Sequence, residues 1–170
     1  MKLKSIDYDL KKSKIQNTTS TVFKWAQVNN TSAEQTLTKT DVLTERDDTY
    51  EFRWDKASKI PATLKANISI PCNGSAGVSL STEMCVRMGS TAGTQTSKTD
   101  KLVEEYPAKI PRYSTVTATS TFTEGKTIIP FTAILYYGDD IEHTFAEKGV
   151  FYGCNFFDFK NVFKETSLTA

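Results

Sequence analysis

The sequence predicts an all-β fold with many antiparallel strands. Several runs alternate apolar and polar residues with a period of two, which is the pattern of a strand with one buried face. Turn-forming residues separate these runs, and no run shows the longer period of an amphipathic helix. At 170 residues one domain is expected, and a hydrophobic fraction of 38% is low for a deep compact core. The composition therefore allows an elongated all-β module of antiparallel strands, spanning residues 1–170.

The first part of the chain supplies three predicted strands. Residues 3–10 alternate, and residues 21–28 are rich in the β-branched and aromatic types that favour strands. The polar residues 11–20 are predicted to be a connector, and residues 29–32 have the composition of a turn. Residues 36–44 are mostly Thr and predict a third strand that is polar on both faces, with a weakly specified register.

Residues 48–88 form the stretch around which the rest is organised. Tyr50, Phe52 and Trp54 alternate with polar residues, and after a polar interruption the alternation resumes over residues 62–70. Two such runs joined by a polar tip predict an amphipathic β-hairpin. Each arm has about the 9–11 residues of a tilted membrane strand. Such a hairpin can pack on a soluble core or join copies of itself in a membrane barrel.

The second half of the chain is predicted to continue as strands and turns. Residues 71–77 and 124–126 have the composition of turns, and residues 78–88 alternate as a half-buried strand. Pro107 and Pro111 restrict the residues between them to a sheet edge or an extended connection. Further strands are predicted at 114–123, 127–137, 149–153 and 156–163. Of these, 127–137 is apolar on both sides and is the best candidate for a buried strand.

The order of these segments resembles the pore-forming module of the aerolysin and epsilon-toxin superfamily, which includes the natterin-like proteins. The resemblance covers most of the chain, and its motifs have the family's order and spacing. One departure is Arg112-Tyr113, where the family often has Pro-Gly. The matching features are Asn29-Asn30-Thr31-Ser32-Ala33-Glu34-Gln35-Thr36 before a Thr-rich strand, the amphipathic hairpin, the step Ile70-Pro71, Ala108-Lys109-Ile110-Pro111 before a long strand, Ile129-Pro130-Phe131-Thr132-Ala133, and Gly149-X-X-Tyr152-Gly153.

The resemblance implies a mechanism. Family members are soluble β-proteins that assemble into a ring on a membrane, where each subunit adds one pre-stem hairpin to a shared barrel. By this implication the lipid-facing residues are Tyr50, Phe52, Trp54, Ala62, Leu64, Ala66 and Ile68. The residues that face the pore lumen are Glu51, Arg53, Thr63, Lys65, Asn67 and Ser69.

The resemblance also implies partners. The chain is expected to form a homo-oligomer in the pore state and to bind a membrane lipid or a glycan receptor. Targeting is expected from a partner chain, from a separate lectin-like domain, or from a small patch around Tyr8 and Trp25. The expected location is secreted or endolysosomal, although no apolar leader is visible after Met1.

Other interpretations stay open at this stage. Tyr50, Phe52 and Trp54 also fit an ordinary sheet face packed on Leu64 and Ile68. The same fold can serve a non-lytic lectin-like or storage protein. The net charge of +1 argues against a nucleic-acid partner, and no apolar run is long enough for a membrane helix.

No constellation in the sequence points to an enzyme or a cofactor. There is no Gly-X-Ser-X-Gly elbow and no Gly-rich phosphate loop. His143 is expected at the surface, and the acidic stretch of Asp139, Asp140 and Glu142 reads as a solvated turn, not as a metal site. Cys72, Cys85 and Cys154 are an odd number without metal spacing, so a disulfide framework is not expected and one pair stays open. Cys72 is interpreted as a small turn residue.

Overall fold

The computed structural model describes residues 1–168, apart from the side chains of residues 37–44 and 102–108. The predicted two-sided polarity of residues 36–44 and the side chains of Pro107 and Ala108 therefore lie outside the described part. Strands dominate, and the only helical elements in the described chain are the single-turn 3-10 helices η1 (Leu10–Lys12) and η2 (Ala57–Lys59). The predicted all-β class is confirmed.

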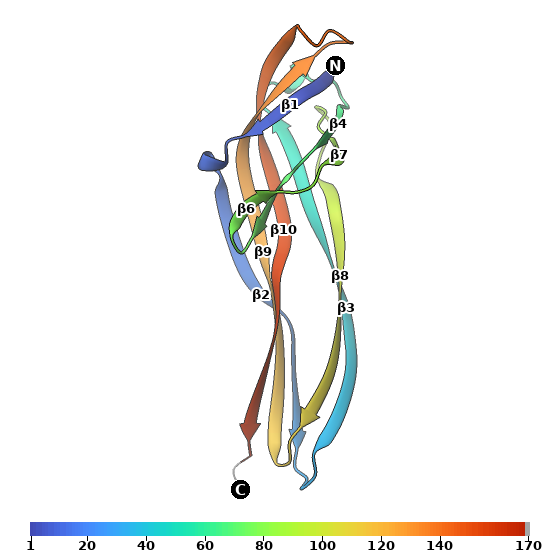
Figure 1. Cartoon of the computed structure of the whole chain (residues 1–170), viewed down its shortest axis with the longest axis vertical. Helices are drawn as coiled ribbons and strands as arrows, with labels where there is room; N and C mark the ends of the chain where they lie inside the picture. The colour runs from blue at the N-terminus through green and yellow to red at the C-terminus, as the bar shows by residue number, and fades with distance from the viewer. Residues whose placement is uncertain (169–170) are drawn as a thin grey trace. The chain divides into compact units, whose positions relative to one another are not determined.

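The long strands form one six-stranded sheet, in which most paired strands lie far apart in the sequence (Figure 1). Its order is β1-β9-β10-β3-β8, and β2 also pairs with β9. β3 and β10 pair antiparallel with Phe52 opposite Phe151, and β1 pairs with β9 with Ile6 opposite Ala133. β8 lies at an edge of this sheet, which is one of the two arrangements that Pro107 and Pro111 left open. The strands are β1 (Lys2–Tyr8), β2 (Lys14–Asn29), β3 (Gln35–Trp54), β8 (Gln95–Ile110), β9 (Ser114–Tyr136) and β10 (Thr144–Ser167).

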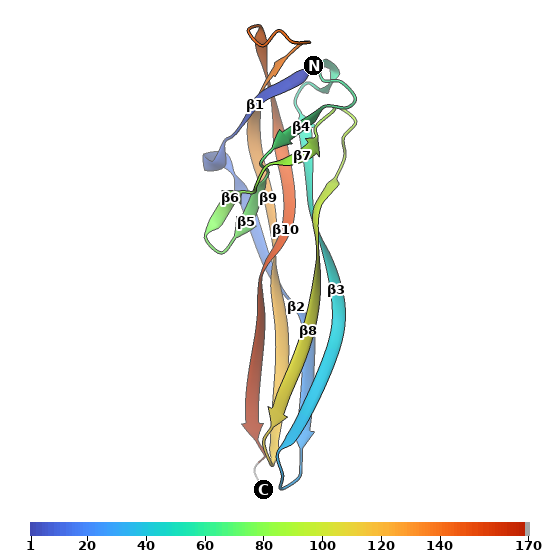
Figure 2. The same ribbon diagram turned by 45° about the vertical axis from the view of Figure 1, so that its right-hand side comes forward.

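Residues 55–94, which we call the cover segment, join β3 to β8 and carry four short strands. β4 (Lys65–Ile68) pairs with β7 (Met84–Arg87), and β5 (Pro71–Gly74) pairs with β6 (Gly77–Leu80). Figures 1 and 2 both show β5 and β6 beside β9 and β10. The core lies between the cover segment and the sheet. It contains Ile60, Leu64, Ile68, Ile70, Val86 and Met88 from the cover, and Tyr50, Phe52, Trp54, Ile129, Phe131, Ala133, Leu135 and Phe151 from the sheet.

The chain divides into two compact units. Unit 1 contains Met1–Asn17, Asp47–Lys98 and Glu124–Phe157, and unit 2 contains Thr18–Arg46, Thr99–Thr123 and Asp158–Ala170. Strands β2, β3, β8, β9 and β10 each contribute residues to both units. All the predicted hairpin residues belong to unit 1.

In unit 2, the buried side chain of Asn29 organises two turns. Its carbonyl oxygen accepts hydrogen bonds from the Thr31 amide at 3.0 Å and the Thr31 hydroxyl at 2.7 Å. Its amide nitrogen donates to the backbone oxygens of Ala33, Ile110 and Pro111 at 2.8, 3.0 and 3.1 Å. These bonds confirm the predicted turn after Asn29 and give a physical reason for an Asn there. The β8–β9 turn is present without Pro-Gly, because Tyr113 adopts a φ of 47°.

The predicted turn at residues 124–126 is wrong, because β9 continues through it. The buried face of β9 switches from even-numbered residues, up to Phe122, to odd-numbered residues from Gly125 onward. The change of face falls where β9 passes from unit 2 into unit 1. Gly125 suits this point because a Cβ there would lie 2.5 Å from the Asn73 side-chain nitrogen. The turn-like composition therefore marks the place where the strand changes its buried face.

Three other boundaries also differ from the prediction. The connector at residues 11–20 is much shorter, because β2 begins at Lys14. Residues 71–74 form β5, so the turn is confined to the residues between β5 and β6. Residues 78–88 are split between β6 and β7 by a break near Ser81, whose backbone and hydroxyl both bond to Ile70. In the last two segments, residues 71–77 and 78–88, a strand ends or begins within a few residues. A pattern of alternation needs a longer run than this to show a boundary.

Candidate functional site

The two arms of the predicted hairpin do not pair with each other. Residues 50–54 lie at the end of β3 and pair with residues 149–153 of β10. Residues 65–68 form β4 and pair antiparallel with β7, with Asn67 opposite Cys85. The predicted hairpin is therefore wrong as a pairing in this state. The alternation was real in each run, but alternation gives a strand's faces and not its partner.

The predicted lipid-facing side chains mostly lie in the core. Tyr50, Phe52, Trp54, Leu64 and Ile68 are between 2% and 9% exposed, whereas Ala66 is half-buried and Ala62 is exposed. The Phe52 ring packs edge-on against Phe131 and Phe151, with centroids 5.5 and 5.3 Å apart. The Trp54 indole donates a hydrogen bond to the Met88 carbonyl of the cover segment. In this state these residues have the role of an ordinary sheet face.

The predicted lumen-facing side chains point the other way. Arg53, Thr63, Lys65 and Asn67 are exposed, and Glu51 and Ser69 are half-buried. Arg53 forms two hydrogen bonds of 3.0 Å to the Glu51 carboxylate, which raises the pKa of the Arg53 guanidinium. The guanidinium also lies 4.4 Å above the Tyr152 ring. The two faces of both runs are thus separated by polarity, as the sequence predicted.

Polar contacts fasten the cover segment to the sheet. Lys59 forms an ion pair of 3.1 Å with Glu147 of β10, whose side chain is 8% exposed. The Asn155 side chain bonds the backbone of Asn73 in both directions, accepting from its N–H at 3.0 Å and donating to its oxygen at 2.8 Å.

Buried polar atoms under the cover segment weaken this attachment. Both polar atoms of the Asn73 side chain and the Thr127 hydroxyl are buried without a partner among the described residues. A buried unpaired polar group costs about 1–3 kcal/mol. Apolar packing and a few polar contacts therefore hold the cover segment in place. These polar atoms of Asn73 and Thr127 reduce the free energy of this attachment.

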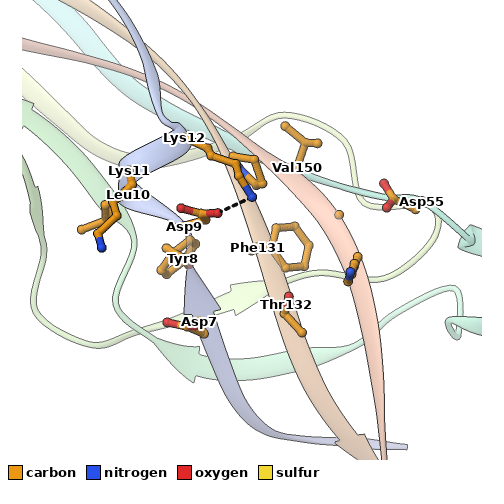
Figure 3. A pocket seen from close by; sticks show the side chains of 13 residues that line it. Asp7, Tyr8, Asp9, Leu10, Lys11, Lys12, Asp55, Phe131, Thr132 and Val150 are labelled. Atoms are coloured by element: carbon orange, nitrogen blue, oxygen red, sulfur yellow. Dashed lines mark ion pairs between the residues drawn. The ribbon is translucent and has the colours of Figure 1, made fainter.

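A groove of about 530 Å³ lies where β1, β9 and β10 meet (Figure 3). Lys12 and Asp9, three residues apart in its lining, form an ion pair of 3.0 Å, which lowers the pKa of Asp9. Tyr8 belongs to this region, but its hydroxyl donates to the Ser69 carbonyl at 3.1 Å and burial raises its pKa. Trp25 belongs to unit 2. The Tyr8 ring is thus used for packing, and the groove presents mixed charges: Asp7, Asp9, Asp55, Lys11, Lys12 and Lys148.

The remaining candidates carry no catalytic arrangement. Cys72, Cys85 and Cys154 are all free, so the disulfide that the sequence left open is not formed. Burial raises the pKa of Cys72, and burial followed by Glu124 raises that of Cys154 to about 11. His143 is exposed, as predicted. Within residues 1–168, no group of three or more His, Cys, Asp or Glu side chains could hold a metal, and no helix is long and apolar enough to cross a bilayer.

Comparison with known proteins identifies the fold. No family model and no curated protein matches the sequence. The lamprey immune protein superposes with a TM-score of 0.69 at 16% identity, over 96% of this chain and 52% of that protein. The chain thus spans about half the length of the lamprey protein. An aerolysin-like protein of Bombina maxima superposes with a TM-score of 0.67 at 13% identity, over 95% of this chain and 97% of that one.

These superpositions define the class: the chain has the aerolysin-like fold, so the resemblance seen in the sequence is confirmed at the level of the fold. The same fold does not fix activity. A non-toxic crystal protein from Bacillus thuringiensis superposes with a TM-score of 0.54 at 7% identity, over 99% of this chain and 90% of that protein.

Proposed function

We propose that the chain is a β-barrel pore-forming protein that oligomerises on a membrane and inserts one hairpin per subunit. The observation that carries the proposal is the position of the cover segment. It joins β3 to β8, which are neighbours in the sheet, yet its own strands form two small separate sheets on the apolar face. If the cover segment detached, β3 and β8 would be free to continue as one long hairpin.

The cover segment already contains a turn at its midpoint. Gly74 and Gly77 face each other where β5 turns into β6, and Gly77 adopts a φ of 107°. With this turn as the tip, each arm would have about 20 residues, twice the 9–11 that a tilted strand needs to cross a bilayer. This revises the predicted hairpin, because residues 50–54 and 62–70 then belong to the same arm.

The predicted faces survive this revision. The even-numbered residues of the first arm would lie on the outer face of the barrel, where the roughly 9–11 residues that cross the bilayer meet lipid. They include Tyr50, Phe52, Trp54, Ala62, Leu64, Ala66 and Ile68, together with Lys56 and Ser58 of the polar interruption. The odd-numbered residues between them would lie on the inner face, toward the lumen. The second arm follows the same rule, with its apolar side chains at even positions: Val78, Leu80, Met84, Val86 and Met88. Alternation of this kind on both arms suits a barrel wall.

The free-energy cost of detaching the cover segment in water favours detachment only at a membrane and together with assembly of several copies. Six apolar side chains of the cover segment are buried in the core. Exposing them to water would cost on the order of 10–20 kcal/mol, at about 1.5–3 kcal/mol each. Hydrocarbon can replace that burial. A single hairpin cannot satisfy its backbone hydrogen bonds in hydrocarbon, so copies must close a barrel together.

The test uses two neighbouring exposed residues of β6. Leu80 is 52% exposed and Ser79 is also exposed, so arginine at either position leaves the closed core intact. Leu80→Arg would place a charge on the outer face of the second arm, three residues from the turn at Gly77, at a cost of roughly 2–4 kcal/mol where this part of the arm crosses the bilayer. We expect it to abolish dye release from liposomes. Ser79→Arg would add charge to the lumen, so it should keep dye release and shift the ion selectivity of single channels toward anions.

The outcomes separate the possible hairpins. Equal dye release by Leu80→Arg and Ser79→Arg would refute the assignment of β6 to the second arm of the inserted hairpin. If Lys65→Glu nevertheless changed ion selectivity, the shorter hairpin of the sequence prediction would stand. Substitution of Phe52 or Leu64 is unsuitable here, because each is 2% exposed and its loss would unfold the monomer.

A non-lytic binding module is the second candidate, and the non-toxic crystal protein of the same fold favours it. Absence of release by the parent chain would support this function, provided that lipid extracts and limited proteolysis were also tested. A pore-forming chain would recognise its target membrane through a membrane lipid or a glycan, or through a separate targeting chain or domain. Such a protein would act in a secreted or endolysosomal setting.

A further inference from the structure

The loop between β9 and β10, residues 137–143, holds large apolar side chains in solvent. Tyr137 is 61% exposed and Ile141 is 51% exposed. The Tyr137 ring stacks on Phe145, with centroids 5.3 Å apart and planes inclined by 23°. Single exposed apolar residues are common, but this short loop carries two of them. The loop belongs entirely to unit 1.

The backbone of this loop is held by internal bonds. The Asp140 N–H donates to the Tyr137 oxygen at 3.2 Å, and the Ile141 N–H donates to the Asp139 oxygen at 3.0 Å. The Lys4 ammonium of β1 donates to the Ile141 carbonyl at 3.3 Å. An ordered loop loses little conformational entropy on binding, so it is ready to present its side chains.

Charges on the loop are largely paired. Asp139 forms an ion pair of 2.5 Å with Lys2, and Asp140 accepts hydrogen bonds from the backbone and ring of His143, the latter at 2.7 Å. Glu142 and Lys4 add one charge of each sign. With nearly balanced charge, the loop has no electrostatic reason to prefer an anionic surface.

We propose that this loop is the surface by which the chain first binds an electroneutral lipid bilayer, with Tyr137 and Ile141 entering the interfacial region. The proposal rests on the membrane assembly proposed above and adds its point of first contact. Tyrosine is suited to the interface because its ring is apolar and its hydroxyl is polar. The paired carboxylates and internally bonded amides lower the penalty of leaving water.

The experiment is flotation of the full chain with vesicles of pure phosphatidylcholine. The variant is Tyr137→Asp combined with Ile141→Asp, and the matched control is Val162→Asp, because Val162 is 58% exposed but lies in unit 2. We expect the partition coefficient of the double variant to be lower than that of the parent by a factor of about ten or more. Burial of one such side chain changes the partition coefficient by roughly ten- to a hundredfold. The control should partition like the parent. Equal melting temperatures would establish that all variants are folded.

Several outcomes would overturn the proposal. They are unchanged binding of the double variant, equal loss in the Val162→Asp control, or parent binding that requires anionic lipid or a glycan receptor. A second measurement places an environment-sensitive dye at Ile141→Cys in a Cys85→Ser background, where a blue shift on vesicles is expected. Failure of the pore itself is distinguishable, because Leu80→Arg should bind vesicles like the parent while releasing no dye.

Discussion

The buried hydroxyl of Thr127 gives a sharp test of how the closed state is balanced. Thr127 is 2% exposed, and its hydroxyl has no partner among the described residues. It lies on the buried face of β9, two residues from Gly125, which meets Asn73 of the cover segment. Thr127→Val replaces the hydroxyl with a methyl group of the same shape and keeps the β-branched side chain that suits a strand. We expect the closed state to gain about 1–3 kcal/mol.

For a chain of this size, 1 kcal/mol raises the melting temperature by roughly 2–4 °C, so the expected increase is about 2–12 °C. Thermal unfolding followed by circular dichroism measures it. The matched control is Thr63→Val, because Thr63 is exposed in the cover segment and should change stability by less than about 0.5 kcal/mol. A Thr127→Val protein that melts at or below the parent temperature would refute the reasoning. If detachment of the cover limits pore formation, the same variant should release dye more slowly.

Three further predictions concern other parts of the fold. Asn29→Ala removes the side chain that bonds two turns of unit 2 and should lower the free energy of unfolding by about 1–3 kcal/mol in urea titrations, whereas Asn30→Ala, at an exposed neighbour, should not. Tyr113→Gly should stabilise the β8–β9 turn by about 0.5–1 kcal/mol, because a φ of 47° disfavours any side chain; a lower melting temperature would contradict this. At pH 8, alkylation followed by mass spectrometry should modify the exposed Cys85 before Cys154, whose pKa of about 11 keeps its thiol protonated. Because folding raises that pKa from 9.0, stability should be constant below pH 9 and fall as pH rises toward 11, and a stability that increased over that range would be inconsistent with the burial.

Several features could be predicted from the sequence because they depend on neighbours along the chain. Period-two alternation defined the two faces of residues 50–54 of β3 and of β4, and the apolar face is the more buried one in the structure. The composition around Asn29 predicted a turn, since a short polar side chain can bond its own backbone two residues on. The all-β class followed from the same local signals.

The local sequence led to a wrong prediction where the same composition fits two different structures. The stretch at residues 124–126 has turn-like composition, yet it lies inside β9, where the buried face of the strand changes and Gly125 leaves room for the side chain of Asn73. The exposed tip at Tyr137 and Ile141 was also missed. Exposure on a loop depends on what packs against it, and no pattern along the chain records that.

The sequence by itself determined that the alternating runs at residues 50–54, 62–70 and 78–88 carry their large apolar side chains at even-numbered positions. Only the tertiary structure decided where the apolar side goes. Phe52 faces Phe151 across β3 and β10, and Leu64 lies in the same core from a separate small sheet. Pairing across about a hundred residues depends on which surfaces fit when the chain closes, and the period of a strand contains no information about its partner.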